Sequence, residues 1–300
     1  MKEIKPIKIK KDMKVNELVE QMSEAGFGAR KIGLANKLAK KIFSNKECKV
    51  FFGLAGAMVP AGMKQIIIDL INDKKIHVLV TTGANLTHDL IEALGESHYH
   101  CDKWDDKELN EKGLDRMYNV LMKNKVYEKL EGFFEENWDE LAKTKNIKEF
   151  LLKIGSLLPE DSNSIFRACY DNNIQLYCPA IADSGIGLMV WGQKVKNKEI
   201  SIDTFEDMKE IIDFSWTSKI KAVIYVGGGT PKNFIQQSLQ FSSGANYGIQ
   251  ITTDSPAGGG SSGAPLEEGK SWGKLKLDAG EGDYVDVNCD ATIALPLIFS

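Results

Sequence analysis

The chain has 300 residues, of which 43% are hydrophobic, so it can bury a full core and disorder is not the default expectation. Its formal net charge of −4 at pH 7 argues against a nucleic-acid binder, which would normally show a basic face. The length fits one large α/β domain.

The cysteines and the N-terminus indicate the compartment. The five cysteines are widely spaced, without a Cys-x-x-Cys pair, as expected of reduced thiols. Residues 1–14 form a lysine-rich segment without an apolar signal region, and we expect a loose arm there, or an edge strand over residues 1–12. No apolar run reaches the length of a membrane span. The sequence therefore predicts a soluble, cytoplasmic protein.

Two strand-turn-helix units follow two N-terminal helices. Helical spacing predicts helices over 16–22 and 29–43. A buried strand over 49–54 runs into the small-residue turn 55–62 and a helix over 62–72. A second strand over 77–81 leads through the turn 81–85 to a helix over 87–94. Such units imply parallel strands with crossover helices, and their turns suit a phosphate at a helix N-terminus. Tight packing of helix on strand would select the same small residues.

The sequence predicts mostly helices in the middle of the chain. His98 and His100 would point the same way only on a strand, and no third ligand stands near them, so we predict no metal site. Apolar residues from Tyr127 to Trp138 form a stripe that favours core or subunit contact over a cofactor site. Helices are expected over 113–123, 127–144, 147–152 and 161–171, the last capped by Asp161 or Ser162.

The second half returns to α/β order. A strand over 174–180 precedes Asp183 and the segment to Gly187, where open parallel sheets place ligands. After a helix over 205–214, the strand 221–226 ends in three glycines, Gly227 to Gly229, which allow a ligand to approach the backbone before the next helix. A strand over 247–252 follows, and residues 286–297 close the chain with Asp290 at a turn.

The loop 258–276 carries the main chemical candidate. Its Gly and Ser residues and Pro265 exclude a helix or a central strand there. Near its end stand Glu268, Trp272 and Lys274. A lysine becomes nucleophilic where apolar surroundings disfavour its charge, and an indole can desolvate it and stack on a cationic ligand. Most lysines, however, are solvated surface charges. No linker or internal repeat divides the chain, so we predict one domain over 1–300.

Several of these motifs, in this order, resemble the deoxyhypusine synthase family. The similarity runs from Phe51 to Leu297 and is carried by Ser271 to Lys274, Gly227 to Gly229, Cys178 to Ala180 with Asp183, Val80 to Thr82, and Asp290 with Ala291. It implies a doubly wound, Rossmann-like α/β fold with a mostly parallel sheet, an NAD cofactor, and a homotetramer with active sites at subunit interfaces.

The resemblance also implies a reaction. NAD takes a hydride from spermidine, an active-site lysine captures the oxidised polyamine as an imine, and diaminopropane leaves. The lysine then passes an aminobutyl group to a lysine of the hypusine-containing translation factor or, in related enzymes, to putrescine. Lys274 matches the family lysine, Trp272 its stacking indole and Glu268 a polyamine carboxylate. Cofactor positions fall on Thr81, Thr82, Asp183, Gly227, Gly228, Thr252, Ser262, Asp290 and Ala291, with Asp183 suited to a ribose hydroxyl and the glycines to the pyrophosphate.

This chain departs from the family mainly on the amine side. Eukaryotic members have aspartate at the positions of Leu188 and Ser261 and histidine at that of Asn233, and an expected acidic residue appears as Thr87 or His88. In the first turn a Ser-Asn pair is replaced by Gly56 and Ala57. Either the polyamine binds differently, with His88 and Glu267 contributing, or another amine is the donor or acceptor. The pattern resembles a divergent archaeal or bacterial synthase. An NAD-binding protein without polyamine chemistry is the remaining alternative.

Overall fold

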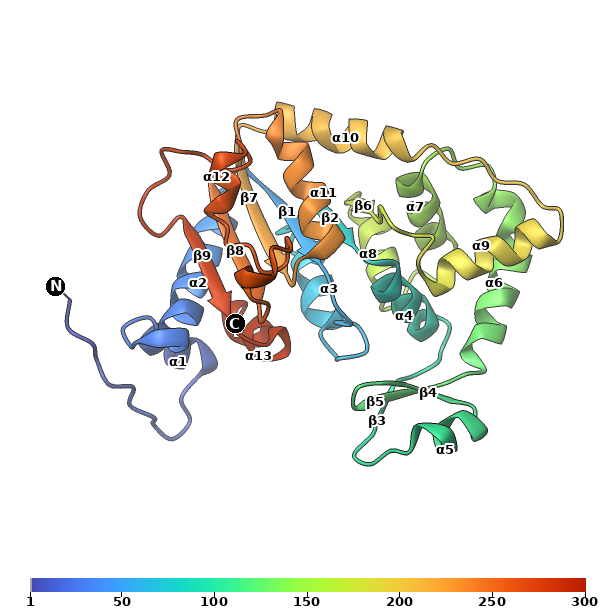
Figure 1. The fold of residues 1–300 in the computed structure, drawn as a ribbon, viewed down its shortest axis with the longest axis horizontal. Coiled ribbons are helices and arrows are strands. Elements are labelled where there is room, and N and C mark those ends of the chain that lie inside the picture. Colours follow the sequence, from blue (N-terminus) through green and yellow to red (C-terminus); the bar gives the residue numbers. More distant parts are fainter. Residues whose placement is uncertain (1) are drawn as a thin grey trace. The chain divides into compact units, whose positions relative to one another are not determined.

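The protein is an α/β fold built on a mostly parallel sheet, as the sequence predicts (Figure 1). A computed structural model describes residues 2–300; Met1, the first residue of the predicted arm, lies outside them. The six-stranded sheet has the order β6-β2-β1-β7-β8-β9, and a small sheet has the order β3-β5-β4. The pairs β1–β7, β7–β8 and β8–β9 are parallel.

The chain divides into two compact units. The first comprises the chain up to Ala55, Asp73–Val80 and Phe205–Ser300, and the second comprises Gly56–Asn72 and Thr81–Thr204. A single domain over 1–300 stays a prediction.

The first unit holds the central strands. Strand β7 is buried from its second residue onward, which requires cover on both faces of the sheet. Helix α2 packs on β8 and β9, whereas α11 packs on β1. Strand β2 ends, and helix α10 begins, at the boundary with the second unit. The elements of the first unit are α1 (Val15–Met22), α2 (Phe27–Ser44), β1 (Cys48–Leu54), β2 (Val78–Thr81), α10 (Thr204–Thr217), β7 (Ile220–Val226), α11 (Gly229–Gln240), β8 (Tyr247–Thr252), η1 (Pro256–Gly258), α12 (Glu268–Ser271), β9 (Tyr284–Asn288) and α13 (Ala291–Ile298).

The second unit is mainly helical. The predicted apolar stripe lies on α6, and its residues Leu130, Phe133, Phe134 and Trp138 are buried, so the stripe belongs to the core. The elements are α3 (Lys64–Asn72), α4 (Gly83–Ala93), β3 (Tyr99–His100), α5 (Asp106–Glu111), β4 (Leu114–Met117), β5 (Val120–Lys123), α6 (Val126–Leu141), α7 (Ile147–Leu157), α8 (Ile165–Asp171), β6 (Gln175–Tyr177) and α9 (Gly185–Val195).

The helix expected over residues 113–123 is wrong. This segment forms the antiparallel hairpin of β4 and β5, in which Met117 pairs with Val120. Gly113 and Tyr118 have positive φ values of 66° and 52°, which a helix interior cannot accommodate. Strand β3 then pairs with β5. The tight turn at Tyr118 and the cross-strand pairing of the hairpin therefore outweigh the local helical spacing of charged residues.

Helix α8 begins later than expected. Its N-cap is Ser164 instead of Asp161 or Ser162. The buried carboxylate of Asp89 on α4 accepts hydrogen bonds from Ser164 Oγ at 2.7 Å, Ile165 N at 3.0 Å and Phe166 N at 3.1 Å. Burial raises the pKa of Asp89, but all three partners are donors, which favours the ionised form. A contact across the second unit therefore sets where α8 starts.

Replacing Asp89 with asparagine should destabilise the protein by about 2–3 kcal/mol, because the amide nitrogen cannot accept the donors of α8. Thermal or urea unfolding would measure the loss. Asp69→Asn provides the control, since Asp69 lies on the exposed side of α3 and accepts one bond from Gln65. Equal stabilities of the two variants would contradict the assigned role of Asp89.

The lysine-rich N-terminal segment forms no strand within residues 2–14. It is held against the region after α1 by hydrogen bonds from Lys5 N to Glu24 O at 3.0 Å and from Lys8 N to Gln21 Oε1 at 2.8 Å. Ion pairs of Lys2 and Lys5 with Glu24 add to this contact. The edge-strand alternative is therefore wrong for these residues.

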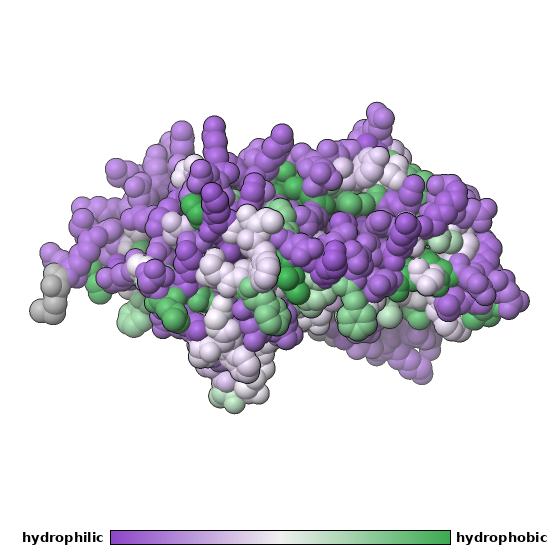
Figure 2. Space-filling model, turned by 90° about the horizontal axis from the view of Figure 1, so that it is seen from above, coloured by the Kyte–Doolittle hydropathy of each residue, from purple (hydrophilic) through white to green (hydrophobic). Residues whose placement is uncertain are grey.

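Hydrophilic side chains predominate on the face of the molecule shown in Figure 2, with hydrophobic residues in small groups between them. Among residues 2–300, none of the helices has both the length and the apolar character that crossing a bilayer requires.

Candidate functional site

A pocket of about 320 Å³ in the first unit brings together four of the predicted amine-site residues. Lys274, Trp272 and Glu268 line it from the region of α12, and Asn233 lines it from α11. Ser261, a position of departure from the family, belongs to the same pocket. The structure thus unites side chains that are up to about forty residues apart in the sequence.

The turn after α12 positions Lys274. Gly273 has a φ of 69°, and Lys274 N bonds back to Gly269 O at 2.9 Å. The next residues are joined to Ala245, which accepts from Lys276 N and donates to Lys274 O, both at 3.0 Å. The backbone on both sides of Lys274 is therefore fixed. The expectation of a loop without helix over residues 258–276 is wrong at Glu268–Ser271, which forms the one-turn helix α12, because the run of helix-breaking Gly and Ser residues and Pro265 all lie before it.

The Lys274 side chain has the environment of a nucleophilic amine. Only 8% of the residue is exposed, and its Nζ lies 5.0 Å from the centroid of the Trp272 ring. Burial lowers the pKa of Lys274, while the carboxylate of Glu268 opposes this effect. The neutral form of Lys274 is accordingly more populated than that of a solvated lysine.

Trp272 and Glu268 leave surface for a ligand. Trp272 is 58% exposed although its ring lies close to Lys274. The Glu268 carboxylate is exposed and makes no hydrogen bond or ion pair with the residues that the structure describes. An aromatic face and a carboxylate that no side chain hydrogen-bonds, at one pocket, suit a cationic, flexible amine.

Sequence reasoning missed a second lysine at this pocket. Lys232 on α11 is only 1% exposed, and its Nζ donates to Ser261 O at 2.6 Å and to Ala264 O at 2.7 Å. It thereby holds the glycine-rich loop against α11. Burial lowers the pKa of Lys232 to about 8. A lysine in the first turn of a helix gives no sequence signal for such burial, because the covering loop arrives almost thirty residues later.

The contribution of Lys232 to stability should depend on pH. Because burial lowers its pKa from 10.5 to about 8, the folded protein binds fewer protons than the unfolded chain between these values. Its contribution to the free energy of unfolding therefore rises, by about 3 kcal/mol, as the pH increases through this window. Urea titrations of the wild type and of Lys232→Met at several pH values would measure it. A pH-independent difference between the two proteins would contradict a buried, titrating Lys232.

The glycine turn after β7 fits a phosphate group. Gly227 has a φ of 70°, and a Cβ on Gly228 would lie 2.1 Å from the Cα of Ser262. Helix α11 begins directly afterwards, and no side chain caps its N-terminus. Glycine at position 228 is therefore required for the loop around Ser262 to pack on this turn, and the uncapped first turn of α11 carries a partial positive charge. The structure thus brings together Gly227, Gly228 and Ser262, which the resemblance assigns to the cofactor.

The other predicted cofactor positions of the first unit follow β8 and β9. Thr252 ends β8 and pairs with Asn288 at the end of β9, so both strands end at the same edge of the sheet. Asp290 caps α13 by accepting from Thr292 N at 2.7 Å, and Ala291 is the first residue of that helix. Thr252 Oγ1 accepts from Asp254 N at 3.0 Å. The structure thus places these residues where the sheet topology expects ligands.

The predicted cofactor positions of the second unit surround two helix N-termini. Thr82 caps α4, which begins at Gly83 and not at Thr87 as expected, because the Thr82 side chain accepts from Asn85 N. A Cβ on Gly83 would lie 2.4 Å from Ser184 Cβ, so the starts of α4 and α9 meet closely. Thr81 is buried, whereas Asp183 is exposed. No hydrogen bond to the Asp183 carboxylate occurs within residues 2–300, which leaves it available to a hydroxyl group.

The amine-side positions His88 and Leu188 lie in the second unit. His88 is buried on α4, and Leu188 is 54% exposed on α9. Burial lowers the pKa of His88 to about 4, so its imidazole is neutral at physiological pH.

Comparison with known proteins shows the relatives of the chain. The family model for deoxyhypusine synthase matches residues 17–300. A probable deoxyhypusine synthase 1 of Archaeoglobus fulgidus is 40% identical, with 97% of this chain and 95% of the relative covered. One from Methanosarcina acetivorans is 41% identical over 99% of this chain and 93% of its own length. A solved structure described as a putative deoxyhypusine synthase from Entamoeba histolytica aligns with a TM-score of 0.69 at 18% identity, covering 96% of this chain and 92% of its own.

Proposed function

Because the chain belongs to the deoxyhypusine synthase family, we propose that it transfers an aminobutyl group from spermidine, through an imine on Lys274, to a lysine of the hypusine-containing translation factor. The observation that carries the proposal is the buried amine of Lys274 beside Trp272 and Glu268 in one pocket. The family membership supports a transferase; the donor, acceptor and intermediate are our proposal.

NAD is the proposed cofactor. Gly227, Gly228 and Ser262 would hold its pyrophosphate, with Thr81, Thr82, Asp183, Thr252, Asp290 and Ala291 at the remaining positions. When bound, NAD would accept a hydride from the amine carbon of the polyamine and return it to the product. The tight approach of Gly228 to Ser262 and the uncapped start of α11 are the structural features that support this assignment.

The residues of the pocket account for the transfer step. Glu268 would accept hydrogen bonds from an ammonium group of the substrate, while the Trp272 ring contacts the polyamine chain and excludes water. Neutral Lys274 would form a bond to the oxidised carbon as the C–N bond to diaminopropane breaks. The leaving amine takes the protons that the Lys274 nitrogen gives up, so the Lys274 imine forms without another reactant.

A different acceptor remains a second candidate. Asn233 and Ser261 stand in the pocket where the resemblance expects histidine and aspartate, which leaves Glu268 as the carboxylate among its lining residues. Fewer anionic groups favour a smaller or less charged amine, as in homospermidine-type transfer to putrescine. An NAD-binding role without polyamine chemistry would follow if no amine were turned over.

Self-association is part of the proposal. On α9, Leu188, Trp191 and Val195 are 54%, 64% and 62% exposed, and their spacing places them along one side of the helix. An exposed apolar stripe of this kind supports contact with another subunit, consistent with a homotetramer. A cytoplasmic location, without nucleic-acid or membrane partners, completes the proposal.

Borohydride trapping tests the proposed intermediate. Incubation with NAD and spermidine, followed by reduction, should add an aminobutyl mass to the peptide that contains Lys274. Parallel assays with the translation factor and with putrescine would identify the acceptor. If no polyamine released diaminopropane while calorimetry showed NAD binding, the non-enzymatic alternative would hold instead.

A further inference from the structure

The pocket of Lys274 contains a buried side-chain amide that has no partner. Gln236 lies on α11, about one helical turn after Lys232, and lines the same pocket of about 320 Å³. Only 8% of the residue is exposed, and its amide makes no hydrogen bond within residues 2–300. A Cβ on Gly269 would lie 3.7 Å from Gln236 Nε2, so the amide packs against the turn that carries Glu268. A largely desolvated amide without a partner is available to a ligand.

The charged groups of this pocket are unequally exposed. Its titratable lining residues are Lys232, Lys274 and Glu268, of which Glu268 is exposed and the two lysines are buried. Burial lowers the pKa of both lysines. For Lys232, the carboxylates of Asp286 on β9 and of Glu268 oppose this effect, and the ammonium of the other lysine adds to it. The buried part of the pocket therefore disfavours a further positive charge.

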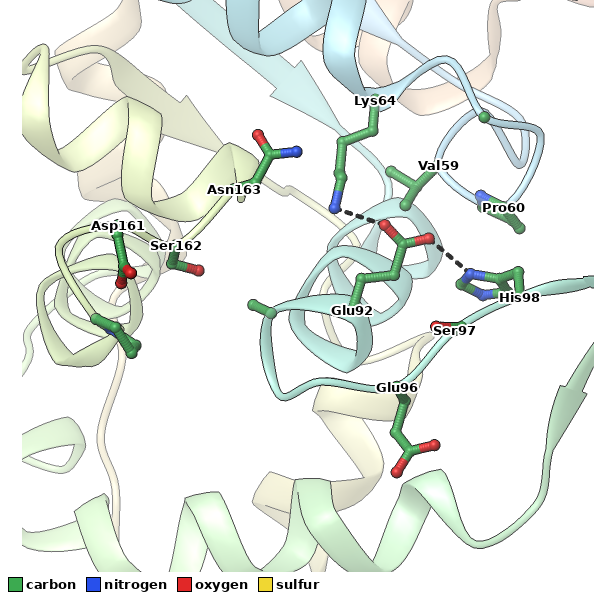
Figure 3. A pocket seen from close by; sticks show the side chains of 13 residues that line it. Val59, Pro60, Lys64, Glu92, Glu96, Ser97, His98, Asp161, Ser162 and Asn163 are labelled. Atoms are coloured by element: carbon green, nitrogen blue, oxygen red, sulfur yellow. Dashed lines mark hydrogen bonds and ion pairs between the residues drawn. The ribbon is translucent and has the colours of Figure 1, made fainter.

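A buried lysine of the second unit has the opposite environment. The side chain of Lys64 is only 13% exposed, and its Nζ pairs with Glu92 Oε2 at 2.5 Å (Figure 3). A carboxylate at this distance favours the charged form of an amine. Neither Lys232 nor Lys274 has a carboxylate within ion-pair distance among residues 2–300. The buried part of the Lys274 pocket thus lacks the group that would hold an ammonium.

The proposed reaction needs one nitrogen of the polyamine in its neutral form. Diaminopropane leaves by cleavage of the bond between the oxidised carbon and the secondary nitrogen of spermidine. A hydride leaves that carbon only if the nitrogen supplies its lone pair to the new C=N bond, and a protonated nitrogen has no lone pair. In water an aliphatic amine is mostly protonated at neutral pH, because its pKa is about 10. The pocket must therefore favour the neutral form of this nitrogen.

We propose that Gln236 binds the secondary nitrogen of spermidine and selects its neutral form, whereas Glu268 binds a terminal ammonium. This inference rests on the proposed function and restricts its donor to amines with an internal secondary nitrogen. A neutral secondary amine has one N–H group, which Gln236 Oε1 accepts. The protonated form has two N–H groups, and one of them would lack an acceptor.

Atoms and charges balance in this arrangement. The proton of the secondary nitrogen passes to solvent as the amine enters the pocket. The lone pair then forms the second bond of C=N while the carbon gives its hydride to NAD. The resulting positive charge on the carbon–nitrogen group makes the carbon the electrophile that neutral Lys274 attacks.

Calorimetry of spermidine binding tests the inference without turnover. NADH replaces NAD, so no hydride transfer occurs, and two buffers of different ionisation enthalpy give the number of protons released. At neutral pH the wild type should release up to about one proton more per spermidine than Gln236→Glu, because a carboxylate stabilises the protonated nitrogen. This difference should persist in Lys274→Arg, whose side chain stays protonated. Equal proton release by the wild type and Gln236→Glu would overturn the inference, as would loss of the difference in the arginine background.

Gln236→Glu should also shift the pH profile of NADH formation from NAD and spermidine. The rate should rise about 1 pH unit later than in the wild type, so it should fall about tenfold at neutral pH, while KM does not rise. Gln236→Met has a similar length without hydrogen-bonding atoms. It should raise KM about 5- to 10-fold and leave the pH profile in place. An unshifted profile in the glutamate variant would contradict the role of Gln236.

Gln240→Glu is the matched control. Gln240 lines the same pocket from the end of α11, but the residue is exposed. Water screens the same change of charge there, so proton release and the pH profile should match the wild type. An equal shift in both glutamate variants would reveal a general electrostatic effect and overturn the inference. Absence of spermidine binding to the NADH complex would instead refute the proposed function.

Discussion

Replacing Lys274 with arginine should abolish aminobutyl transfer, reducing the rate by more than about a thousandfold, because the reaction loses its nucleophile. Arginine keeps the positive charge and much of the length, but its guanidinium stays protonated and cannot form the imine. Reduction with borohydride should leave the variant without added mass, as measured by mass spectrometry of the intact protein. NAD binding, measured by calorimetry, should change little, since the proposed cofactor positions are not altered.

Lys270→Arg is the matched control for this experiment. Lys270 lies four residues earlier, in α12, and pairs with Glu267 at 3.2 Å near the surface. Its replacement should leave transfer and trapping intact. If the Lys274 variant still acquired the aminobutyl mass, another amine would be the nucleophile, and the buried Lys232 of the same pocket would be the next candidate.

Replacing Gly228 with alanine should weaken NAD binding strongly. The new Cβ would lie 2.1 Å from Ser262 Cα, a backbone atom that cannot move without displacing the loop. Overpacking of this kind costs about 1–3 kcal/mol of folding stability and lowers the melting temperature. Because displacement of the loop also moves Ser262 out of its proposed contact with the cofactor, we expect NAD affinity to fall by about 10- to 100-fold. Calorimetry with NAD and thermal unfolding without it would separate the two effects.

Gly258→Ala gives the comparison for the glycine variant. A Cβ at Gly258 meets nothing within 4 Å, although the residue belongs to the same glycine-rich region. Alanine should therefore be tolerated there in both measurements. Undiminished NAD affinity in the Gly228 variant would remove this turn from the cofactor site and place the phosphate group elsewhere.

All strands of the central sheet except β9, and most of the long helices, were predictable because their patterns are local. Strand β7 is continuously apolar, as strands buried on both faces are, and the helix pattern of α6 is clear in its apolar stripe. The hairpin of β4 and β5 was missed because the helical spacing of its residues continues across a tight local turn, where Tyr118 has a positive φ. The start of α8 was misplaced for a different reason, because Asp89, which bonds to it, lies about seventy-five residues earlier.

The candidate site likewise combines residues that a local motif indicated with a residue that only the packing of distant segments brings to the pocket. Lys274, Trp272 and Glu268 were found from a short motif, whose residue types themselves indicate amine chemistry. Lys232 gave no signal, because its burial depends on a loop that folds back over α11. The sequence also gave a reason to name His88, but it did not show that His98 hydrogen-bonds to His88 and to Glu92.

By itself, the sequence determined the α/β class, the glycine turns at the strand ends and the family, because each depends on residue types at short spacing. Only the tertiary structure decided which side chains lose contact with water and which polar atoms meet. Proton positions and the nucleophilicity of a lysine depend on desolvation and on partners from other elements. These properties therefore follow from the packing of distant segments, which short sequence patterns do not specify.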